Sequence, residues 1–203
     1  MPSVTNPNNL MRNPMGPGTS SHYSVASNPP QHPATLPSDM PKKWVLPDHR
    51  RLVRVPRKLC YEPLHAPYRP VTFSTNGWPG VRVRDVLNNT VMVDAPYDTP
   101  FLPYGWRTTR VSLEWPGYHH RPDLQKERIN TVMPGQQPIT RQVLAQYICS
   151  ILQNFCQSVK RLGVTPTYGS WALKDDHIGL MHIFLLSIHY YQDQWVPEFY
   201  VFE

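Results

Sequence analysis

The chain has 203 residues, of which 40% are apolar and 11% aromatic, so it is long enough and apolar enough to build one core. It also has 24 prolines, about twice the usual share, and their uneven placement indicates that part of the chain is not packed. The composition excludes a membrane-spanning protein, because the longest apolar run, Ile183–Ile188, is far too short to cross a bilayer.

The formal net charge of +6 belongs to one short segment. Residues 42–58 hold seven basic side chains against Asp48 alone, whereas residues 59–203 hold 12 basic and 12 acidic side chains. The basic character of the chain is therefore local, and it does not indicate a nucleic-acid-binding fold.

The cysteines predict a reducing compartment. Cys60, Cys149 and Cys156 are odd in number and lack the spacing of a disulfide framework. Cys149 and Cys156 lie two turns apart on one helix face, roughly 10 Å along its axis, which is more than a disulfide bridges. We expect buried, reduced thiols and an intracellular protein of the cytoplasm or nucleus. The first residues, MPSVTNPNNLMRNP, also lack the apolar stretch of a secretory signal.

Two segments precede the expected body. Residues 1–41 are rich in Pro, Asn and Ser, which predicts a disordered leader with local polyproline II at pairs such as Pro29-Pro30. Residues 42–58, KKWVLPDHRRLVRVPRK, interleave basic and apolar side chains, and Pro47 and Pro56 exclude a continuous helix. They fit an extended strap that packs its aliphatic side chains against the folded domain and directs its arginines outward. A solvated linker is the alternative.

Residues 59–118 contain several short apolar segments. Val71–Ser74 and Val81–Arg84 are predicted strands, and the second alternates apolar and basic side chains as a half-buried strand does. Thr108–Trp115 is the best strand of this half. Pro100–Trp106, PFLPYGW, is an aromatic and proline-rich connection between strands.

The tripeptide Trp-Pro-Gly occurs at Trp78 and again at Trp115, beside predicted strands. We interpret the two copies as independent turns, each with a packed tryptophan, rather than as a decayed repeat. Residues 119–138 are polar and are predicted to be an insertion that ends at Pro138.

The stretch TRQVLAQYICSILQNFCQSVKRLG predicts one long amphipathic helix over 140–162. Its apolar side chains recur at the i, i+3, i+4, i+7 spacing of a helix with one buried stripe. Thr140 is the expected N-cap, and Ile139 can pack on Leu144 as a hydrophobic staple. Lys160 and Arg161 fall in the last turn, and Gly163 follows where a left-handed residue is expected. The helix would be roughly 33 Å long.

The last segment favours a C-terminal β-hairpin. Residues 184–191 have alternating and largely apolar side chains, and Trp195–Phe202 forms a second β run in which Pro197 indicates an edge strand. A helix over 177–190 is the alternative, because Ile178, Met181, Leu185 and Ile188 also fit a helical period.

Tests for catalytic and metal chemistry give no site. His177, His182 and His189 do not share one face of a strand or of a helix, so they cannot converge on a metal ion. Cys149 and Cys156 lie on or near the buried stripe, where a nucleophile would be inaccessible. Gly-x-Ser-x-Gly and phosphate-binding glycine motifs are absent from the sequence. We therefore assign no catalytic residue, no metal and no cofactor, and regard an enzyme of unrecognised type as an alternative only.

The strap could instead contact a phosphate backbone, and seven such contacts would give a log–log salt slope of roughly −6. The aromatic stacking residues of single-strand-binding proteins lie elsewhere in the chain. A nuclear localisation role is an equally simple reading of the basic pairs. The candidate nucleic-acid-binding residues are Lys42, Lys43, Arg50, Arg51, Arg54, Arg57 and Lys58.

The second half resembles a domain of unknown function that is common in mushroom-forming fungi, over about residues 110–202. The resemblance rests on the strand and turn Val111–Tyr118, on Pro138-Ile139-Thr140 opening an amphipathic helix, and on a final strand that contains Trp195. Arg141 after the threonine and the aromatic C-terminal segment depart from the pattern of that family. The resemblance implies an α+β fold and brings no known activity or catalytic residues.

We therefore predict an α+β protein in which a small antiparallel sheet packs on the 140–162 helix. The disordered leader spans 1–41, the basic strap 42–58 and a single domain 59–203. The expected function is that of a non-enzymatic, intracellular protein-interaction module, with nucleic-acid association as the alternative and no membrane contact. Two aromatic, proline-rich loops, Pro96–Trp106 and Tyr190–Phe199, favour protein contacts. The candidate partner-binding residues, all in the first of these loops, are Tyr97, Phe101, Tyr104 and Trp106.

Overall fold

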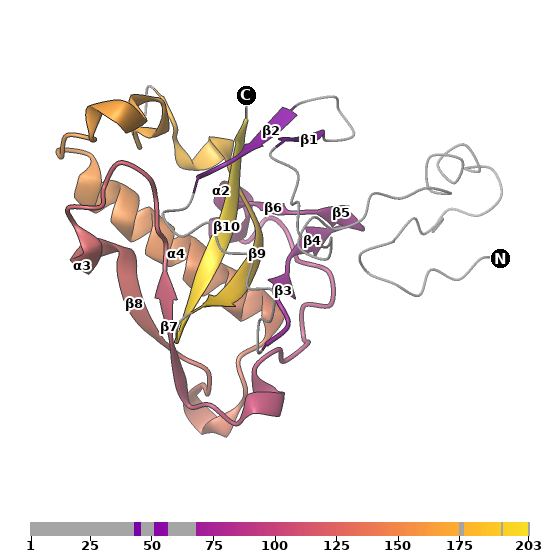
Figure 1. Cartoon of the computed structure of the whole chain (residues 1–203). Coiled ribbons are helices and arrows are strands. Elements are labelled where there is room, and N and C mark those ends of the chain that lie inside the picture. Colours follow the sequence, from indigo (N-terminus) through magenta and orange to yellow (C-terminus); the bar gives the residue numbers. More distant parts are fainter. Residues whose placement is uncertain (1–42, 46–50, 57–67, 175–176, 192, 203) are drawn as a thin grey trace, which may run out of the picture.

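The computed structural model describes residues 43–45, 51–56, 68–174, 177–191 and 193–202. The predicted disordered leader, at 1–41, lies outside the described residues. Within them the chain is an α+β protein in which a twisted sheet packs on one long helix (Figure 1).

The long helix α4 (Arg141–Val159) confirms the main sequence prediction. Thr140 caps it, because the Thr140 side chain accepts a hydrogen bond from the Val143 N–H at 3.4 Å. The buried stripe is continuous along one face and consists of Leu144, Ala145, Ile148, Cys149, Ile151, Leu152, Phe155, Cys156 and Val159.

The C-terminal end of α4 differs from the prediction. The helix stops at Val159, and Gly163 is not left-handed. The Leu162 N–H donates to the Val159 carbonyl at 2.8 Å, so a tight turn satisfies the end of the helix without a left-handed residue.

The sheet is built around the hairpin of β9 (Ile183–Tyr191) and β10 (Gln194–Phe202), which decides in favour of strand at 183–191. The register shifts by one residue between Glu198 and Phe199 of β10, because β9 has one extra, unpaired residue there, Leu186. On its outer side β9 pairs with β3 (Val71–Thr72) and with β6 (Val81–Arg82).

The other side of β10 is shared by two pairs of strands. Its first part pairs with β7 (Thr108–Ser112), which pairs in turn with β8 (Lys126–Asn130). Its last part pairs with β2 (Arg51–Arg54), and β2 pairs with β1 (Lys43–Val45).

Two predictions about this sheet are wrong. The sheet is mixed rather than antiparallel, because β7 runs parallel to β10 and the chain crosses over through α4 between them. Pro197 does not mark an edge strand, because β10 is central. Pro197 lies between the part of β10 that pairs with β7 and the part that pairs with β2, where its missing N–H interrupts no ladder on that side.

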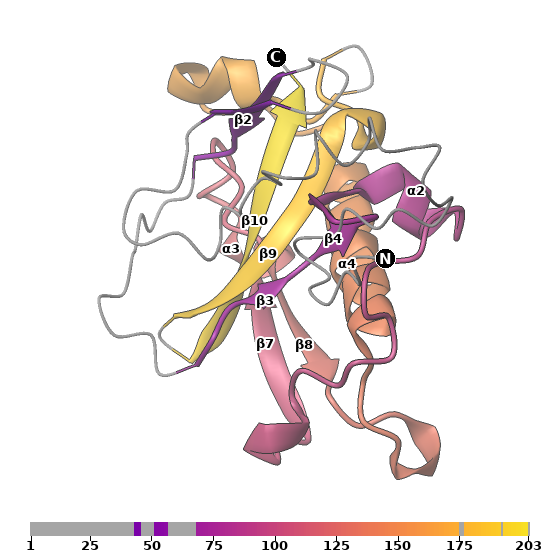
Figure 2. The ribbon, with the colours of Figure 1, turned by 90° about the vertical axis from the view of Figure 1, so that its right-hand side faces the viewer.

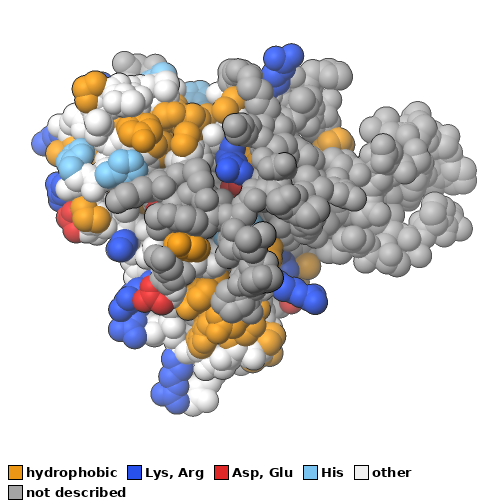
Figure 3. Space-filling model, viewed as in Figure 1, with side chains coloured by type: hydrophobic (Ala, Val, Ile, Leu, Met, Phe, Trp, Pro, Cys, Tyr) orange, Lys and Arg blue, Asp and Glu red, His pale blue; other side chains and the backbone are white. Residues whose placement is uncertain are grey.

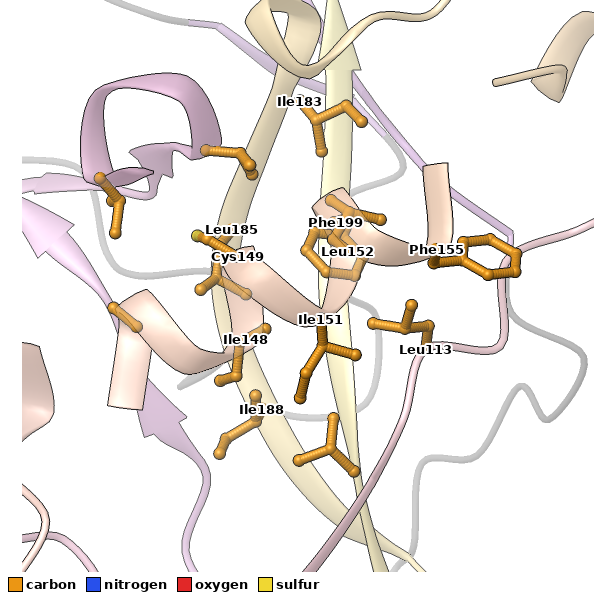
Figure 4. Close-up of a cluster of buried hydrophobic side chains, with 14 of the residues drawn as sticks. Leu113, Ile148, Cys149, Ile151, Leu152, Phe155, Ile183, Leu185, Ile188 and Phe199 are labelled. Carbon is orange, nitrogen blue, oxygen red and sulfur yellow. The ribbon is translucent and has the colours of Figure 1, made fainter. Parts of the chain in front are cut away.

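The core lies between the sheet and α4, which form two layers side by side in Figure 2. Helix side chains such as Ile148, Leu152 and Phe155 meet strand side chains such as Leu185 and Phe199 (Figure 4). Because β9 and β10 are also covered on the opposite face, by a small cluster of Leu52, Phe184, Leu186 and Tyr200, their sequences are apolar on both faces.

The segments before α4 are short. Strands β4 (Ser74–Thr75) and β5 (Trp78–Pro79) form a separate hairpin, and the predicted strand 81–84 is only β6 before the chain turns into helix α2 (Val83–Leu87). The predicted strand 108–115 ends at Ser112. Residues 119–138 are more ordered than predicted, since they contain α3 (Pro122–Gln125) and β8. Their charges fit an exposed edge strand.

Four 3₁₀ turns complete the described elements: η4 (Leu102–Tyr104), η5 (Pro134–Gln136), η6 (Pro166–Trp171) and η7 (Leu180–His182). The second Trp-Pro-Gly copy lies at a turn and its Trp115 is fully buried, as predicted. For the first copy the prediction of a turn is wrong, because Trp78 and Pro79 form strand β5 and Trp78 is only half-buried. In the described part of the chain, no helix has the length and apolar character needed to span a membrane.

Candidate functional site

Four polar side chains lie close together on the face of the sheet opposite α4: Ser187, His189, Glu198 and Arg54. The Ser187 hydroxyl donates to Glu198 Oε2 at 3.0 Å, and His189 Nε2 lies 3.0 Å from the same hydroxyl oxygen. Arg54 of β2 places Nη1 3.7 Å from Glu198 Oε1. The sequence did not single out these residues together, because their convergence depends on the bulged β9–β10 register and on the docking of β2.

This polar group does not have the geometry of a hydrolytic triad. The proton of Ser187 points to a carboxylate, and Glu198 approaches the same His189 nitrogen that faces the serine, at 3.5 Å. In a triad the histidine takes the serine proton and the acid holds the other ring nitrogen. Ser187 and Glu198 are also fully buried. The arrangement therefore connects the strap to the sheet and does not activate a nucleophile.

The thiols are equally unsuited to catalysis. Complete burial raises the pKa of the Cys149 thiol, which keeps it protonated and unreactive. Cys156 is also buried and lines a small cavity of about 250 Å³ at the C-terminal end of α4, together with Lys160, Lys174 and Leu180. In the described ranges, no three His, Cys, Asp or Glu side chains are grouped as a metal site would require.

The most distinctive surface feature is an aromatic cluster of six rings: Tyr68, Phe101, Tyr104, Trp106, Tyr190 and Trp195. Tyr68 stands edge-on to three of the other rings, with centroid distances of 4.6 Å to Tyr104, 4.8 Å to Trp106 and 4.8 Å to Tyr190. Such edge-to-face pairs are favourable beyond the area that they bury. Desolvation in this cluster raises the pKa of the Tyr190 hydroxyl.

The cluster has a buried floor and a half-exposed upper layer. Phe101 is 2% exposed and Trp195 is fully buried, with 5.2 Å between their ring centroids. Tyr68, Tyr104, Trp106 and Tyr190 are each half-buried. Figure 3 shows hydrophobic side chains gathered near the turn end of the β9–β10 hairpin.

A projecting loop, residues 91–104, leads into this cluster. Its backbone is fixed to the start of α4, because the Arg141 and Gln142 N–H groups donate to the Asp98 and Pro96 carbonyls at 2.7 and 3.1 Å. The Gln142 side chain accepts from the Val93 N–H at 2.8 Å. The loop carbonyls thus satisfy the free N–H groups at the positive end of the helix.

Three large apolar side chains of the projecting loop nevertheless face solvent. Tyr97 is 80% exposed, Leu102 61% and Met92 58%. They account for three of the five large apolar side chains that are exposed among the described residues. Exposure is therefore concentrated on a loop whose backbone is held in place.

The four candidate partner-binding residues consequently have different positions. Tyr97 projects from the loop, whereas Tyr104 and Trp106 are half-buried in the aromatic cluster. Phe101 is not available to a partner, because it is part of the buried floor. Tyr68 was missed, and Tyr190 was predicted only as part of a second loop, because these segments are distant in the sequence and meet only in the folded chain.

The basic strap is only partly described. Arg51 is exposed on β2, whereas Arg54 is half-buried against Glu198. The backbone of Lys43 belongs to β1. Four of the candidate nucleic-acid-binding residues lie outside the described residues: Lys42, Arg50, Arg57 and Lys58. The contact of Arg54 with Glu198 competes with any phosphate contact of this side chain.

Comparisons with known proteins give no relative. No family model, no curated protein and no solved structure matches this chain. The arguments for a function therefore come from the geometry of the chain itself.

Proposed function

We propose that this chain is a non-enzymatic protein-interaction module, which binds its partner through the projecting loop and the half-exposed rings of the aromatic cluster. The observation that carries this proposal is the pairing of a fixed backbone with exposed apolar side chains at Tyr97 and Leu102. A loop that is ordered before binding loses little conformational entropy when it binds.

The composition of the surface supports a protein as the ligand. Interface centres are enriched in Tyr, Trp, Phe and Met and depleted of Lys, Glu and Asp. The projecting loop and the aromatic cluster supply those residue types from Met92 through Trp106. Both carboxylates of the projecting loop are already engaged, because Asp98 is paired with Arg141 and Asp94 accepts hydrogen bonds from the Asn76 and Gly77 N–H groups.

The proposed site of action is inside the cell, in the cytoplasm or the nucleus. The support is that Cys149 and Cys156 are buried on one helix and form no disulfide, so they require no oxidising compartment. An interaction module of this kind needs neither a cofactor nor a metal.

Site-specific photo-crosslinking tests the proposal. A photoreactive phenylalanine at Tyr97 of the full chain should form a discrete adduct with a polypeptide in extract from the source cells, identified by mass spectrometry. The matched control carries the same group at Met181, an exposed apolar residue on a different part of the surface. We expect at least about fivefold less adduct from position 181, since a hot-spot contact of 1 kcal/mol already changes occupancy by that factor.

A variant of the aromatic cluster and an activity screen test the proposal further. Trp106→Ala should reduce the adduct at position 97, because Trp106 supports the surface on which the partner lies. Equal adducts from positions 97 and 181, or an adduct at 97 that Trp106→Ala leaves unchanged, would contradict the proposal. Turnover in a broad activity screen would contradict its non-enzymatic part.

A further inference from the structure

We infer that strand β8 binds an extended acidic segment of a partner protein, which adds to the larger sheet as a further antiparallel strand. This surface differs from that of the proposed function, because neither the projecting loop nor the aromatic cluster is part of it. The exposed edge of β8, the direction of its backbone groups and the positive charge of its outer face point to this occupant.

Strand β8 is an end strand of the larger sheet. Within the described residues it pairs with β7 on one side only, and Figure 1 draws it at the outer edge of the sheet. Four of its five residues are exposed, and Ile129 is the buried one. A sheet edge of this kind offers a row of backbone N–H and C=O groups to another chain.

The pairing of β7 with β8 determines which backbone groups point outward. Two hydrogen bonds lie at the ends of this ladder, from the Leu113 N–H to the Gln125 carbonyl at 2.9 Å and from the Thr131 N–H to the Arg107 carbonyl at 3.0 Å. In an antiparallel ladder, hydrogen-bonded pairs alternate with pairs that are not hydrogen-bonded. The odd-numbered residues of β8 therefore direct their backbone groups to β7, and the even-numbered residues direct theirs away from it.

The even-numbered residues thus supply both donors and acceptors to an added strand. Arg128 directs its N–H and its carbonyl outward, Lys126 its carbonyl and Asn130 its N–H. An extended peptide offers the complementary alternation of carbonyls and N–H groups. The phosphates of a nucleic acid offer acceptors only, so the carbonyls of Lys126 and Arg128 disfavour them.

The outer face of this edge is positively charged. Ile129 is buried in the core below α4, and side chains alternate along a strand, so Lys126, Arg128 and Asn130 point to the opposite face. Arg110 of β7 lies directly opposite Arg128. Like charges in directly opposite positions destabilise a pair of strands. A carboxylate on the other side of Arg128 would offset this repulsion.

Among the described residues, only one of these two arginines has an acidic partner. Arg110 forms an ion pair with Asp193 at 3.0 Å. Arg128 instead donates to the neutral hydroxyl of Thr108, at 3.1 and 2.8 Å. In an added strand, acidic residues opposite Arg128 and opposite Lys126 would be two positions apart and on the same face. The complementary segment is therefore acidic at alternate positions.

A second copy of the chain is a poorer occupant of this edge. The antiparallel register that pairs all five residues of two β8 strands puts Arg128 opposite Arg128 and Lys126 opposite Asn130. Charges of this kind keep edge strands from pairing with themselves. The favoured partner strand has acids opposite Arg128 and Lys126 and an apolar residue opposite Ile129, where it extends the core.

Hydrogen exchange of the full chain tests the inference. The probe is the acetylated and amidated peptide Thr-Val-Glu-Thr-Glu, in which the valine is placed opposite Ile129 and the glutamates opposite Arg128 and Lys126. In the chain without peptide, the amides of Glu127 and Ile129 should exchange slowly and those of Arg128 and Asn130 rapidly. At about ten times its dissociation constant, the peptide should slow the Arg128 and Asn130 amides about tenfold and leave the other two unchanged.

Peptides methylated on one amide nitrogen distinguish an added strand from a contact between charges. A methyl group on the first glutamate, whose N–H faces β8, should weaken binding at least about tenfold, because it removes a backbone hydrogen bond and obstructs the approach of the strands. The matched control has the methyl group on the valine, whose N–H faces away from β8, and should bind like the unmethylated peptide. Equal affinities of the two methylated peptides would overturn the inference.

Charge reversal tests the acidic character of the partner. Lys126→Glu combined with Arg128→Glu should weaken binding at least about tenfold and favour the peptide Thr-Val-Lys-Thr-Lys instead. Both side chains are exposed, and the new carboxylate at position 128 lies opposite Arg110, so the fold should persist. The control, Arg51→Glu combined with Arg84→Glu, changes the net charge equally at exposed positions outside β8. Equal losses in the two double variants would contradict a site at β8.

Other outcomes identify other roles for this edge and equally overturn the inference. If the acidic peptide does not bind, the charges of β8 serve only to prevent self-pairing. A single-stranded oligonucleotide that protects the same amides more strongly than the peptide would indicate nucleic acid. Protection of the Arg128 amide that rises with protein concentration alone would indicate a second copy. The adduct at Tyr97 tests the proposed function separately, and its loss beside intact peptide binding would refute that function alone.

Discussion

Arg141 connects segments that are far apart in the sequence. Its guanidinium donates to the Thr72 carbonyl and forms an ion pair with Asp98, and its N–H donates to the Asp98 carbonyl. A cation in the first helical turn is normally unfavourable, because that end of the helix is positive. Here the carboxylate of Asp98 compensates, so this residue positions the projecting loop as well as starting α4.

Gly117 is the glycine that the fold requires most. It has a φ of +85°, and a Cβ there would lie 2.3 Å from Val164 Cγ2. Gly117→Ala should therefore lower the free energy of unfolding by about 3 kcal/mol, from left-handed strain and from overpacking against a stiff β-branched side chain. Urea unfolding measures the change.

Gly105 provides the matched control for this prediction. It is also left-handed, with a φ of +64°, but nothing lies within 4 Å of its added Cβ. Gly105→Ala should cost only about 1 kcal/mol, from strain alone. Equal losses at the two positions would show that the contact with Val164 is unimportant.

At the scale of elements, the strap strand β2 depends on one internal ion pair. Arg54→Ala removes the cation 3.7 Å from the buried carboxylate of Glu198. We expect a loss of about 1 to 2 kcal/mol in the free energy of unfolding and faster hydrogen exchange of the Val55 amide, which donates to the Phe199 carbonyl at 2.9 Å.

Arg51 lies in the same strand and is exposed. Arg51→Ala should change the free energy of unfolding by less than about 0.5 kcal/mol and leave the exchange of the Val55 amide as it is. If Arg51→Ala and Arg54→Ala lowered the free energy of unfolding equally, the cause would be the general loss of positive charge rather than the contact of Arg54 with Glu198.

The elements that could be predicted are those whose secondary structure is determined by the residue pattern of the segment itself. Helix α4 has a stripe of apolar residues and a capping threonine, and the β9–β10 hairpin has two apolar runs joined by a short turn. Strand β8 escaped prediction, because four of its five residues are exposed and charge or polarity dominates its sequence. Its structure is imposed by pairing with β7.

The position of β10 could not be read from its sequence either. Pro197 is typical of an edge strand, but the chain uses β7 and β2 on different parts of the same side of β10. Which distant segments meet there depends on long-range packing, and local patterns carry no information about it. The same reason explains why Tyr68 and Tyr190 were not found as members of the aromatic cluster.

At the scale of the whole molecule, alkaline pH should destabilise the fold. Burial raises the pKa of Cys149 above its ordinary 9.0, and desolvation raises that of Tyr118 above 10.0. Above pH 9 the unfolded chain therefore loses protons that the folded chain retains. The free energy of unfolding should fall as pH rises, by roughly 1.4 kcal/mol per pH unit for one buried thiol.

Urea unfolding between pH 8 and 10.5 measures this dependence. Cys149→Ala should lower the stability at pH 8 but reduce the slope above pH 9 by roughly one proton. The contribution of Tyr118, whose hydroxyl accepts from the Leu173 N–H at 3.1 Å, should remain. A stability that is constant across this range, or a slope that Cys149→Ala leaves intact, would be inconsistent with the burial of the thiol.

The central hairpin also has a consequence for biosynthesis. The strands of the larger sheet pair with β9 or β10, directly or through a neighbouring strand. Strands β9 and β10 follow the end of α4 by some 24 to 43 residues in the sequence. At a translation rate of roughly 5 to 20 residues per second, about 2 to 9 seconds therefore pass between the synthesis of Val159, the last residue of α4, and that of Phe202, the last residue of β10. In that interval the apolar face of α4 is a target for chaperones. A chain whose synthesis stalls before residue 183 would contain α4 but lack β9 and β10, the strands that cover its apolar face.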